Sequence, residues 1–344
     1  MHRFPFLAFY CAVILLLPAC GSSQPDSVGP TQEILVLVDP TDWEVLEKPI
    51  RETFEKVLHT PQAEKIFNIQ YGLLSEMDVK DHLRRKNLLV AAPIDADHEV
   101  GGFLRSLVSD SVRESIHAGR SGVSWKRNVW AKDQLLMVAS GKDLDEVVSN
   151  LRMEADRLFE TVEEARNERV TKLIYKYGER EDVTAQLQQD FGWQIRVPFG
   201  YRILGAQPDS GFVALVKEAP NRWFFVYWED GIAPDTLTDD WVIVKRDEIT
   251  RRFFDGDQIA PDEVEVFRDE FQGKLAVVLQ GLWENQKQWT GGPFKSYAFV
   301  DTEQERFWFV DVGVFSPNKK KETYMRQLDL IAQTFNYAYD RSEG

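Results

Sequence analysis

Two acidic segments contain the side chains that are best suited to metal chemistry. Asp95–Glu99 holds three carboxylates and one imidazole within five residues, and Asp255–Glu263 holds four carboxylates. Carboxylate oxygens and imidazole nitrogens are ligands for divalent cations. However, adjacent loop residues rarely converge on one ion, and Ala260 and Val266 occupy the positions where an EF-hand calcium loop needs glycine and a bidentate glutamate. Both segments are therefore interpreted as solvated turns, and we expect neither a metal nor a cofactor.

The chain carries no sequence motif of the common catalytic classes. The patterns G-x-S-x-G, H-E-x-x-H, G-x-x-x-x-G-K-[ST] and G-x-G-x-x-G are all absent, so nothing in the sequence indicates a serine hydrolase, a zinc protease or a nucleotide-binding enzyme. A pair of carboxylates for glycoside hydrolysis has no fixed spacing, because their separation in space defines the mechanism. The chain has 56 Asp and Glu residues, which leaves room for such a pair. No catalytic residue is assigned.

The segment from Trp289 to Phe294 is the strongest candidate for binding. Gly291 and Gly292 permit unusual backbone angles and close approach of another molecule, Pro293 stiffens the exit, and aromatic side chains stand at both ends. Such a segment is either a hairpin connection within a sheet or a loop that contacts a ligand. We predict Trp289, Gly291, Gly292 and Phe294 as contacts for a ligand or partner, in preference to the acidic segments.

The amino-terminal residues have the pattern of a bacterial secretory signal. The apolar run Phe4–Leu17 is too short to span a bilayer comfortably, and Ala19 stands directly before Cys20. A small residue before cysteine is similar to the lipobox of bacterial lipoproteins, in which the cysteine becomes the acylated first residue. The sequence therefore predicts a signal peptide over residues 1–19, a Cys20 that carries palmitate-type acyl chains, and a flexible tether over residues 20–32.

Charge and cysteine content restrict the partners and the compartment. The formal net charge is −15, from 41 Lys and Arg against 56 Asp and Glu, which repels phosphate backbones and argues against nucleic acid as a partner. Cys11 lies within the predicted leader, so a mature chain acylated at Cys20 has no thiol for a disulfide. Its acyl chains would hold it on a membrane without help from basic residues. Because residues 21–24 contain no acidic side chain, we expect a periplasm-facing position on the outer membrane.

The first half of the chain has the pattern of an α/β domain over residues 33–185. Continuous apolar runs indicate strands buried on both faces, and apolar residues at helical spacing indicate helices between them. Strands are expected at 34–39, 67–73 and 88–92, with one or two more within 125–140, and helices at 43–58 and 78–85. Thr41 or Asp42 is expected to cap the first helix, and Asp143 a long helix with a heptad seam of apolar residues. The seam predicts packing on the chain's own sheet, with an intermolecular coiled coil as the alternative.

The second half is richer in aromatic residues. Seven of the ten Trp follow residue 190, and the composition changes near 180–190. Strands are expected at 212–217, 222–228, 275–282, 296–300 and 307–314, with an amphipathic segment at 241–254 and a terminal helix. Within 222–228 aromatic residues occupy both faces, which is typical of a strand buried on both sides, the alternative being an aromatic platform for a sugar or peptide. This order predicts an α+β domain over residues 186–340, an antiparallel sheet with helices on one side.

Eight short segments, spread over nearly the whole mature chain, are jointly specific. They are Leu17–Cys20, Ile34–Trp43, Val129–Ala131, Phe191–Tyr201, Lys245–Asp247, Gly281–Trp283, Gly291–Phe294 and Tyr324–Leu328. Together they resemble an uncharacterised lipoprotein family common in Bacteroidota, which has no assigned activity; the resemblance implies a cellular address and domain boundaries. The second half also resembles PsbP-like and Mog1-like α+β domains, through Pro198–Tyr201 at its start and the closing helix, which implies a fold and no function.

These observations favour a membrane-anchored lipoprotein without catalytic activity. An aromatic groove of the second domain would bind an envelope protein or a cell-wall ligand, and the acyl chains on Cys20 would bind the membrane. A periplasmic hydrolase with a carboxylate site is the alternative. The two differ in what a structure must show, because a hydrolase needs titratable groups that converge in a cleft, whereas a binding protein needs an apolar concavity.

Overall fold

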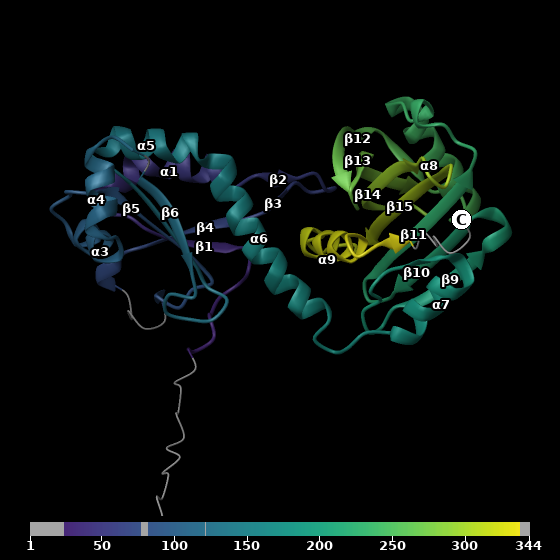
Figure 1. Cartoon of the computed structure of the whole chain (residues 1–344), viewed down its shortest axis with the longest axis horizontal. Coiled ribbons are helices and arrows are strands. Elements are labelled where there is room, and N and C mark those ends of the chain that lie inside the picture. The colour runs from purple at the N-terminus through teal and green to yellow at the C-terminus, as the bar shows by residue number, and fades with distance from the viewer. Residues whose placement is uncertain (1–23, 77–81, 121, 338–344) are drawn as a thin grey trace, which may run out of the picture.

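The computed structural model describes residues 24–76, 82–120 and 122–337, which fold around two large β-sheets. Figure 1 shows one sheet formed by the first half of the chain and another formed by the second half, with a long helix between them. Cys20 lies outside the described residues, as does the first part of the short helix predicted at 78–85. No helix in the described part of the chain is both long enough and apolar enough to cross a membrane.

The first sheet is built from the apolar runs that were expected to form strands. Its strands are β1 (Glu33–Leu37), β4 (Asn68–Gly72), β5 (Asn87–Pro93), β6 (Gly122–Arg127) and β7 (Leu135–Gly141). Their order is β4-β1-β5-β7-β6, parallel except for the antiparallel edge strand β6. The side chains of β1, β5 and β7 are buried on both faces, which is the environment that continuous apolar runs require.

Helices cover both faces of this first sheet. They are α1 (Pro40–Phe54), α3 (Glu99–Leu107), α4 (Asp110–His117), α5 (Leu144–Met153) and α6 (Ala155–Ile174). Apolar side chains of α1, α5 and the first half of α6 pack on one face, and those of α3 and α4 pack on the other. Helices on both sides of a mostly parallel sheet define an α/β domain, so the fold predicted for the first half is confirmed.

Polar side chains cap the starts of α1, α3, α4 and α5. The Asp143 carboxylate accepts a hydrogen bond from the backbone amide three residues later, at 2.9 Å, which confirms this cap for α5. For α1, the prediction of Thr41 or Asp42 is wrong, because Asp39 is the cap. Pro40 begins the helix, where its missing N–H is not needed, and the Asp39 carboxylate accepts hydrogen bonds from the amide and the hydroxyl of Thr41.

The long helix predicted after residue 143 is divided into α5 and α6 by a turn at Glu154, where φ is −101° and ψ is 10°. The seam nevertheless acts as one surface. Leu151 of α5 and Leu158 and Val162 of α6 lie in the same core cluster, together with strands of the first sheet. Packing of the seam on the chain's own sheet is therefore confirmed.

The second sheet has seven strands, all antiparallel to their neighbours. They are β9 (Arg202–Gln207), β10 (Phe212–Lys217), β11 (Asn221–Asp230), β12 (Gln258–Phe271), β13 (Lys274–Asn285), β14 (Thr290–Asp301) and β15 (Arg306–Phe315). Their order is β12-β13-β14-β15-β11-β10-β9. The predicted α+β class with an antiparallel sheet is confirmed. The sequence predicts neither edge strand, because most side chains of β9 and β12 face water and carry no continuous apolar pattern.

Helices cover both faces of the second sheet, not one face as expected. α7 (Glu181–Phe191) and α9 (Glu322–Ala332) pack on one face, and α8 (Asp239–Phe253) packs on the other. The reason is visible in β11, where Phe224 and Val226 point to the first face and Trp223 and Phe225 to the second. All four are buried, so 222–228 is a strand buried on both sides, and each apolar face needs its own cover.

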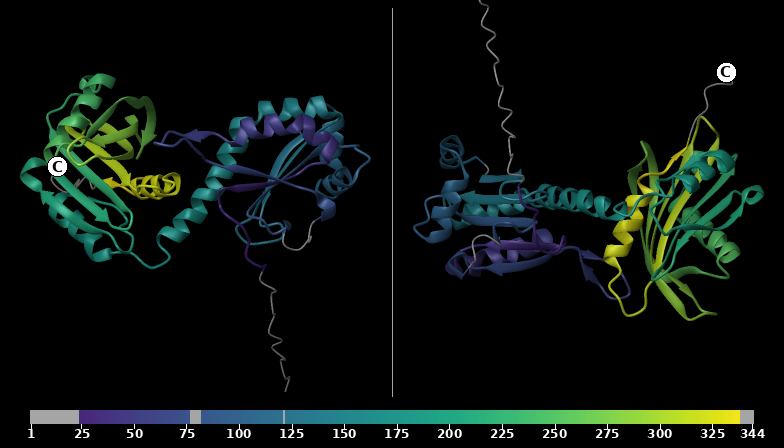
Figure 2. Two further views of the ribbon diagram at one scale, coloured as in Figure 1. Left: turned by 180° about the vertical axis from the view of Figure 1, so that it is seen from behind. Right: turned by 90° about the horizontal axis from the view of Figure 1, so that it is seen from below.

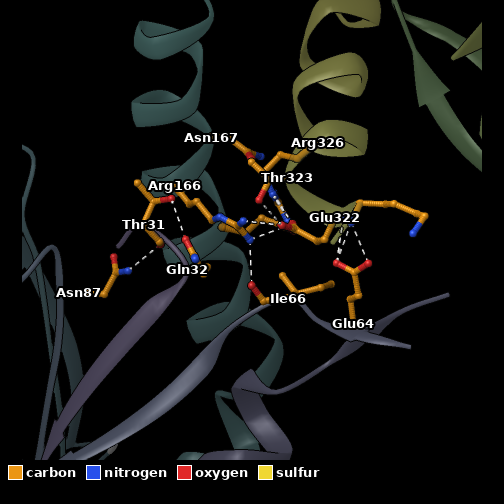
Figure 3. A network of polar contacts seen from close by, with 12 residues as sticks. Thr31, Gln32, Glu64, Ile66, Asn87, Arg166, Asn167, Glu322, Thr323 and Arg326 are labelled. Atoms are coloured by element: carbon orange, nitrogen blue, oxygen red, sulfur yellow. Dashed lines mark hydrogen bonds and ion pairs between the residues drawn. The ribbon is translucent and has the colours of Figure 1, made fainter. Parts of the chain in front are cut away.

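Buried ion pairs between α6 and α9 join the two halves. Arg166 of α6 donates two hydrogen bonds to Glu322 of α9, at 2.9 and 2.6 Å, and a third to the carbonyl of Ile66 (Figure 3). Arg166 is 1% exposed and Glu322 is 6% exposed. Arg326 extends the network to Glu322 and to Glu163 of α6. These contacts fix the junction, because separation of α6 from α9 would leave the buried Arg166 without its carboxylate partner.

A short hairpin of the first half also reaches the second half, as both views of Figure 2 show. It consists of β2 (Val57–Leu58) and β3 (Glu64–Lys65). The Glu64 carboxylate accepts hydrogen bonds from the backbone amides of Lys321 and Glu322, at 2.8 to 3.1 Å, and so caps the start of α9. Leu58 packs against the core of the second sheet. The hairpin and α6 therefore hold α9 from two directions.

The segment predicted as a flexible tether is bound to the first half from Gln24 onward. The Gln24 side chain donates a hydrogen bond to the carbonyl of Asn128 at 2.9 Å, and the amide of Ser27 donates to the carbonyl of Lys132 at 3.2 Å. The tether prediction is therefore wrong for residues 24–32. Ser, Gly and Pro disfavour helices and strands, but they leave backbone groups available to pair with a neighbouring loop.

Candidate functional site

Trp289 lies in the turn between β13 and β14, where 92% of its surface is exposed. Asn285 builds this turn, because its side-chain oxygen accepts hydrogen bonds from the amides of Lys287 and Gln288, both at 3.0 Å. Such bonds from side chain to backbone are the reason that Asn favours turns. Trp289 makes no contribution to the buried core, and its position leaves the indole free to contact a ligand or partner.

The other three predicted contacts lie in strand β14 and not in a loop. A Cβ at Gly292 would lie 2.1 Å from a backbone oxygen of β15, and one at Gly291 would lie 2.8 Å from a backbone oxygen of β13. Both glycines are therefore required for close packing within the sheet. Phe294 is wholly buried, with its ring centre 3.4 Å from the Arg246 guanidinium carbon. Of the four predicted contacts, only Trp289 presents its side chain at the surface.

Beside this turn, the second sheet has a concavity of about 550 Å³, called the groove below. Gln288 and Thr290, on either side of Trp289, both line it. The opposite side is formed by β9 and β10, and the end of α8 closes one wall. Five aromatic side chains line the groove, namely Trp223, Phe253, Phe254, Trp283 and Phe315. A volume of this size is typical of small-molecule sites, which span roughly 300 to 1,000 Å³.

The aromatic side chains form one continuous wall. The ring centres of Trp223 and Trp283 are 5.0 Å apart at an interplanar angle of 71°. Phe254 lies 6.2 Å from Trp223 and Phe315 lies 6.4 Å from Trp283, measured between ring centres, so the two Phe extend the wall. Trp283 is 4% exposed, yet its indole N–H has no hydrogen-bond partner in the described part of the chain. The indole nitrogen itself is buried, 3.2 Å from the place that a Cβ at Gly292 would occupy, so Trp283 contributes its ring to the groove wall.

Polar side chains at the rim are mostly neutralised. Arg202 donates to Glu218 at 2.7 Å, so the guanidinium carries no free charge into the groove. Asn285 donates to the Asp257 carboxylate, also at 2.7 Å. Burial raises the pKa of Asp257, while the hydrogen bond from Asn285 opposes that rise. The rim thus offers hydrogen-bonding groups but no uncompensated cation.

A buried ion pair lies between α8 and the sheet, next to the groove. Arg246 of α8 donates a hydrogen bond to Asp311 of β15 at 2.8 Å, and the hydroxyl of Ser296 donates to the same carboxylate oxygen at 2.6 Å. Arg246 is 1% exposed and Asp311 is fully buried. Arg246 also stacks on Phe294. This pair fastens α8 to the sheet and so positions Phe253 and Phe254 at the groove wall.

The acidic segments have structural roles. His98 caps α3, because its Nδ1 accepts a hydrogen bond from the amide of Gly101 at 3.0 Å. Its Nε2 lies 3.0 Å from a carboxylate oxygen of Asp42, so both ring nitrogens have partners. In the second segment, Asp257 bonds to Asn285. Within residues 24–76, 82–120 and 122–337, no group of three or more His, Cys, Asp or Glu is placed to hold a metal ion.

A further cavity of about 280 Å³ lies between the two halves, and its charged side chains are already paired with one another. Lys295 bonds to Asp329 at 2.9 Å, and Arg326 bonds to Glu163 at 3.0 Å. The first contact joins β14 to α9, and the second joins α9 to α6. The groove is larger and is lined by five aromatic side chains, so it is the better candidate for a binding site.

Trp289 and the aromatic strand are the parts of the groove that the sequence indicates. Phe253 and Phe254 end the amphipathic segment predicted at 241–254, and Phe315 follows the strand predicted at 307–314, so none of the three stands out from its surroundings in the sequence. In the structure Phe253 and Phe254 both pack against Phe212 of β10, with ring centres 3.8 and 5.8 Å away. Two adjacent aromatic residues at the end of a helix exceed what one helical face needs, and this excess is the available signal.

Two protein families match the chain, and the boundary between the matched ranges lies just after the end of α6. Residues 27–175 match one domain of unknown function (DUF8532), and residues 180–334 match another (DUF4837). The chain thus contains two uncharacterised domains. α7 begins at Glu181 and packs on the second sheet, within the second matched range, although the predicted boundary after residue 185 divides this helix.

Solved structures with a similar arrangement are distant. The Ran-binding protein Mog1p of Saccharomyces cerevisiae is 12% identical, with a TM-score of 0.31, over 42% of this chain and 90% of its own. LpqN, involved in cell envelope biogenesis of Mycobacterium tuberculosis, is 14% identical, with a TM-score of 0.28, over 42% of this chain and 82% of LpqN. A protein of Bacteroides thetaiotaomicron is 7% identical, with a TM-score of 0.26, over 43% of this chain and 46% of that protein. No curated protein matches significantly. Similarity at this level carries no argument about function.

Proposed function

We propose that this protein is a non-catalytic lipoprotein of the cell envelope whose second domain binds a neutral cell-wall glycan in the groove. The observation that carries the proposal is the continuous aromatic wall of the groove, with neutral polar side chains at its rim. The apolar C–H faces of a sugar ring pack on aromatic rings, and its hydroxyl groups form hydrogen bonds with amide and hydroxyl side chains such as Asn221 and Thr290. A wholly apolar ligand would leave these rim groups unsatisfied.

The charges at the groove favour a neutral ligand over an ionic one. Arg202 is paired with Glu218, so the rim offers no free cation to an anion. Asp255 and Asp257 also line the groove, and the whole chain carries a net charge of −15, which opposes a second negative charge. Amide and hydroxyl side chains such as Gln288 and Thr290 supply neutral donors and acceptors. A saccharide of two or three rings suits this combination and this volume.

Binding of soluble peptidoglycan glycan strands tests the proposal. Trp289→Ala is expected to weaken binding tenfold or more, since an exposed indole beside the groove would cover one face of the bound chain. The free energy of unfolding should change by less than about 0.5 kcal/mol, because the side chain packs against nothing. Calorimetric titration and urea denaturation of the same preparations measure the two quantities.

Leu275→Ala is the matched control, because Leu275 is also exposed but lies at the other end of β13. It should leave glycan binding unchanged. Equal binding by the Trp289→Ala variant and the parent chain would contradict the proposal, as would a large loss of stability with binding retained.

One observation supports a glycoside hydrolase as the alternative. Asp257 lines the groove and its pKa is raised by burial, which is the property of a general acid. Incubation of the protein with the same glycan strands distinguishes the two functions, because a hydrolase generates new reducing ends and a binding protein does not. We expect none, since Asp257 is already engaged by Asn285.

The anchor is a separate part of the proposal. We propose acylation at Cys20 and a periplasm-facing place on the outer membrane, on the strength of the Leu17–Cys20 pattern and the neutral residues that follow. Cys20→Ser should abolish labelling by radioactive palmitate and release the body into the soluble periplasmic fraction, because no other cysteine follows the leader. Labelling that persists in this variant would contradict the proposed anchor.

A further inference from the structure

A second site in this acidic chain is basic. A cavity of about 200 Å³ lies where the end of α6 meets the second sheet. Lys217 from the end of β10, Arg222 from the start of β11 and Tyr201 before β9 all line it, together with Gln327 of α9. The chain has 56 Asp and Glu residues, but among the described residues none lines this cavity. It therefore lies apart from the groove in both place and charge.

Neither cation has a carboxylate partner within the described residues. Arg222 is 8% exposed, and its guanidinium donates to the side-chain oxygen of Gln327 at 3.1 Å and lies 5.2 Å from the ring centre of Tyr324. The Lys217 ammonium donates to the carbonyl of Phe199 at 3.0 Å. Burial lowers the pKa of Lys217, and repulsion from Arg222 lowers it further. The two positive charges thus face the same cavity, and no carboxylate among the described residues that line it balances them.

Other buried arginines lie close to carboxylates. Arg166 and Arg246 are each 1% exposed, and each contacts a carboxylate, at 2.6 and 2.8 Å. Arg169, 6% exposed, donates to the amide oxygen of Asn87, but Asp133 and Glu168 line the same cavity. A buried charge normally needs such a partner, because desolvation costs several kcal/mol. The partners of Arg222 are all neutral, namely the amide oxygen of Gln327, the carbonyl of Pro220 at 3.4 Å and the ring of Tyr324. An anion bound from solution would supply the negative charge that Arg222 lacks.

Tyr201 provides an independent indication of a ligand. It is 4% exposed, and its hydroxyl has no hydrogen-bond partner in the described part of the chain. Burial raises its pKa to about 12, so the hydroxyl keeps its proton at neutral pH and is available as a donor. The Lys217 ammonium lies 5.6 Å from the Tyr201 ring centre. A phenol that donates beside two cations matches the needs of an oxyanion.

The mouth of the cavity is apolar. Leu173 near the end of α6, Tyr177 after it, and Phe199 before β9 all line the cavity, and all three are exposed. Exposed apolar side chains grouped beside a polar site commonly mark contact with an apolar part of a ligand. A free inorganic anion would use the cations and the phenol but not this apolar surface.

We propose that this cavity binds the oxyanion head of an amphiphile, that is, a phosphate or carboxylate group carried on an apolar chain. The head lies between Arg222, Lys217 and the Tyr201 hydroxyl, and the apolar chain leaves past Phe199 and Tyr177. This site is distinct from the groove, so a glycan and an amphiphile bind independently.

Titration with dodecyl phosphate below its micelle concentration tests the site, using the full chain with Cys20→Ser so that acyl chains cannot contribute. The parent chain should bind one equivalent. Arg222→Gln should weaken binding at least tenfold, and Lys217→Gln and Tyr201→Phe should each weaken it severalfold. Lys48→Gln, which removes an equal charge from the exposed face of α1, should leave binding unchanged. Lys217→Gln keeps the test valid if loss of Arg222 impairs folding.

Three probes separate the sources of the anion. Inorganic phosphate that binds as tightly as dodecyl phosphate would overturn the apolar part of the proposal. Dodecyltrimethylammonium that binds equally well, or variants at Arg222 and Lys217 that bind like the parent chain, would overturn the site itself. Sedimentation with phosphatidylcholine vesicles, with and without phosphatidic acid, then distinguishes the two supporting outcomes. Binding that requires phosphatidic acid and Arg222 identifies a membrane lipid, and its absence identifies a soluble amphiphile.

Discussion

The Asp311→Asn variant is expected to lose about 3 to 5 kcal/mol of the free energy of unfolding. Asparagine has the same shape and can still accept a hydrogen bond from Ser296, but it leaves the charge of Arg246 without a counter-ion in a place that water does not reach. Urea denaturation of the full chain, followed by Trp fluorescence, measures the loss. The large number of Trp residues in the second half makes this signal sensitive to the affected domain.

Two controls identify charge as the cause. Ser296→Ala removes one hydrogen bond to the same carboxylate and should cost only about 1 kcal/mol. The double variant Arg246→Met with Asp311→Leu removes both charges and should recover most of the lost stability. A loss below about 1 kcal/mol for Asp311→Asn, or no recovery in the double variant, would show that the pair does not hold α8 to the sheet.

The Glu322→Gln variant is expected to cost a similar amount, about 3 to 5 kcal/mol, and to separate the unfolding of the two halves. Glu322 accepts hydrogen bonds from both Arg166 and Arg326, so its neutralisation leaves two buried guanidinium groups facing each other at the junction. Repulsion between them would weaken the contact of α6 with α9. Differential scanning calorimetry should then show two transitions, in place of one cooperative transition in the parent chain.

Lys172→Met is the matched control for the junction. Lys172 is also on α6 and pairs with Asp133, but both side chains are exposed. Such a pair contributes about 1 kcal/mol or less, so the variant should unfold like the parent chain. If Glu322→Gln still unfolded in a single transition with unchanged stability, the hairpin contacts of Glu64 and Leu58 would be sufficient to couple the halves.

The parts of the fold that sequence predicts are those whose residues have one environment along their whole length. β5 is apolar and buried from Leu88 to Ala92, and Asp143 precedes a helix that its side chain caps. β12 shows the opposite case. Acidic, exposed side chains interrupt its apolar ones, and it is a strand because β13 supplies its hydrogen bonds. A contact with a neighbouring strand leaves no pattern within the segment itself.

The candidate site was predictable only in part for a related reason. Trp289 could be found, because a large aromatic residue beside glycines is unusual in any setting. Gly291 and Gly292 pointed to a loop, whereas the structure uses them to let β14 approach its neighbours. The unpaired charges of Lys217 and Arg222 could not be found at all. Whether a charge has a partner depends on residues such as Gln327 that are distant in sequence.

The binding of residues 24–32 to the first half determines how far the body could move from a membrane. Gln24 is four residues after Cys20, and an extended chain covers at most about 3.6 Å per residue, so the distance between them is no longer than about 14 Å. With acyl chains on Cys20, the first half would remain at the lipid headgroups. α6, with 20 residues and about 30 Å in length, lies between the two sheets and would act as a spacer between an anchored first half and the second sheet. The protein would therefore meet cell-wall material by its orientation on the bilayer and not by reaching out on a long tether.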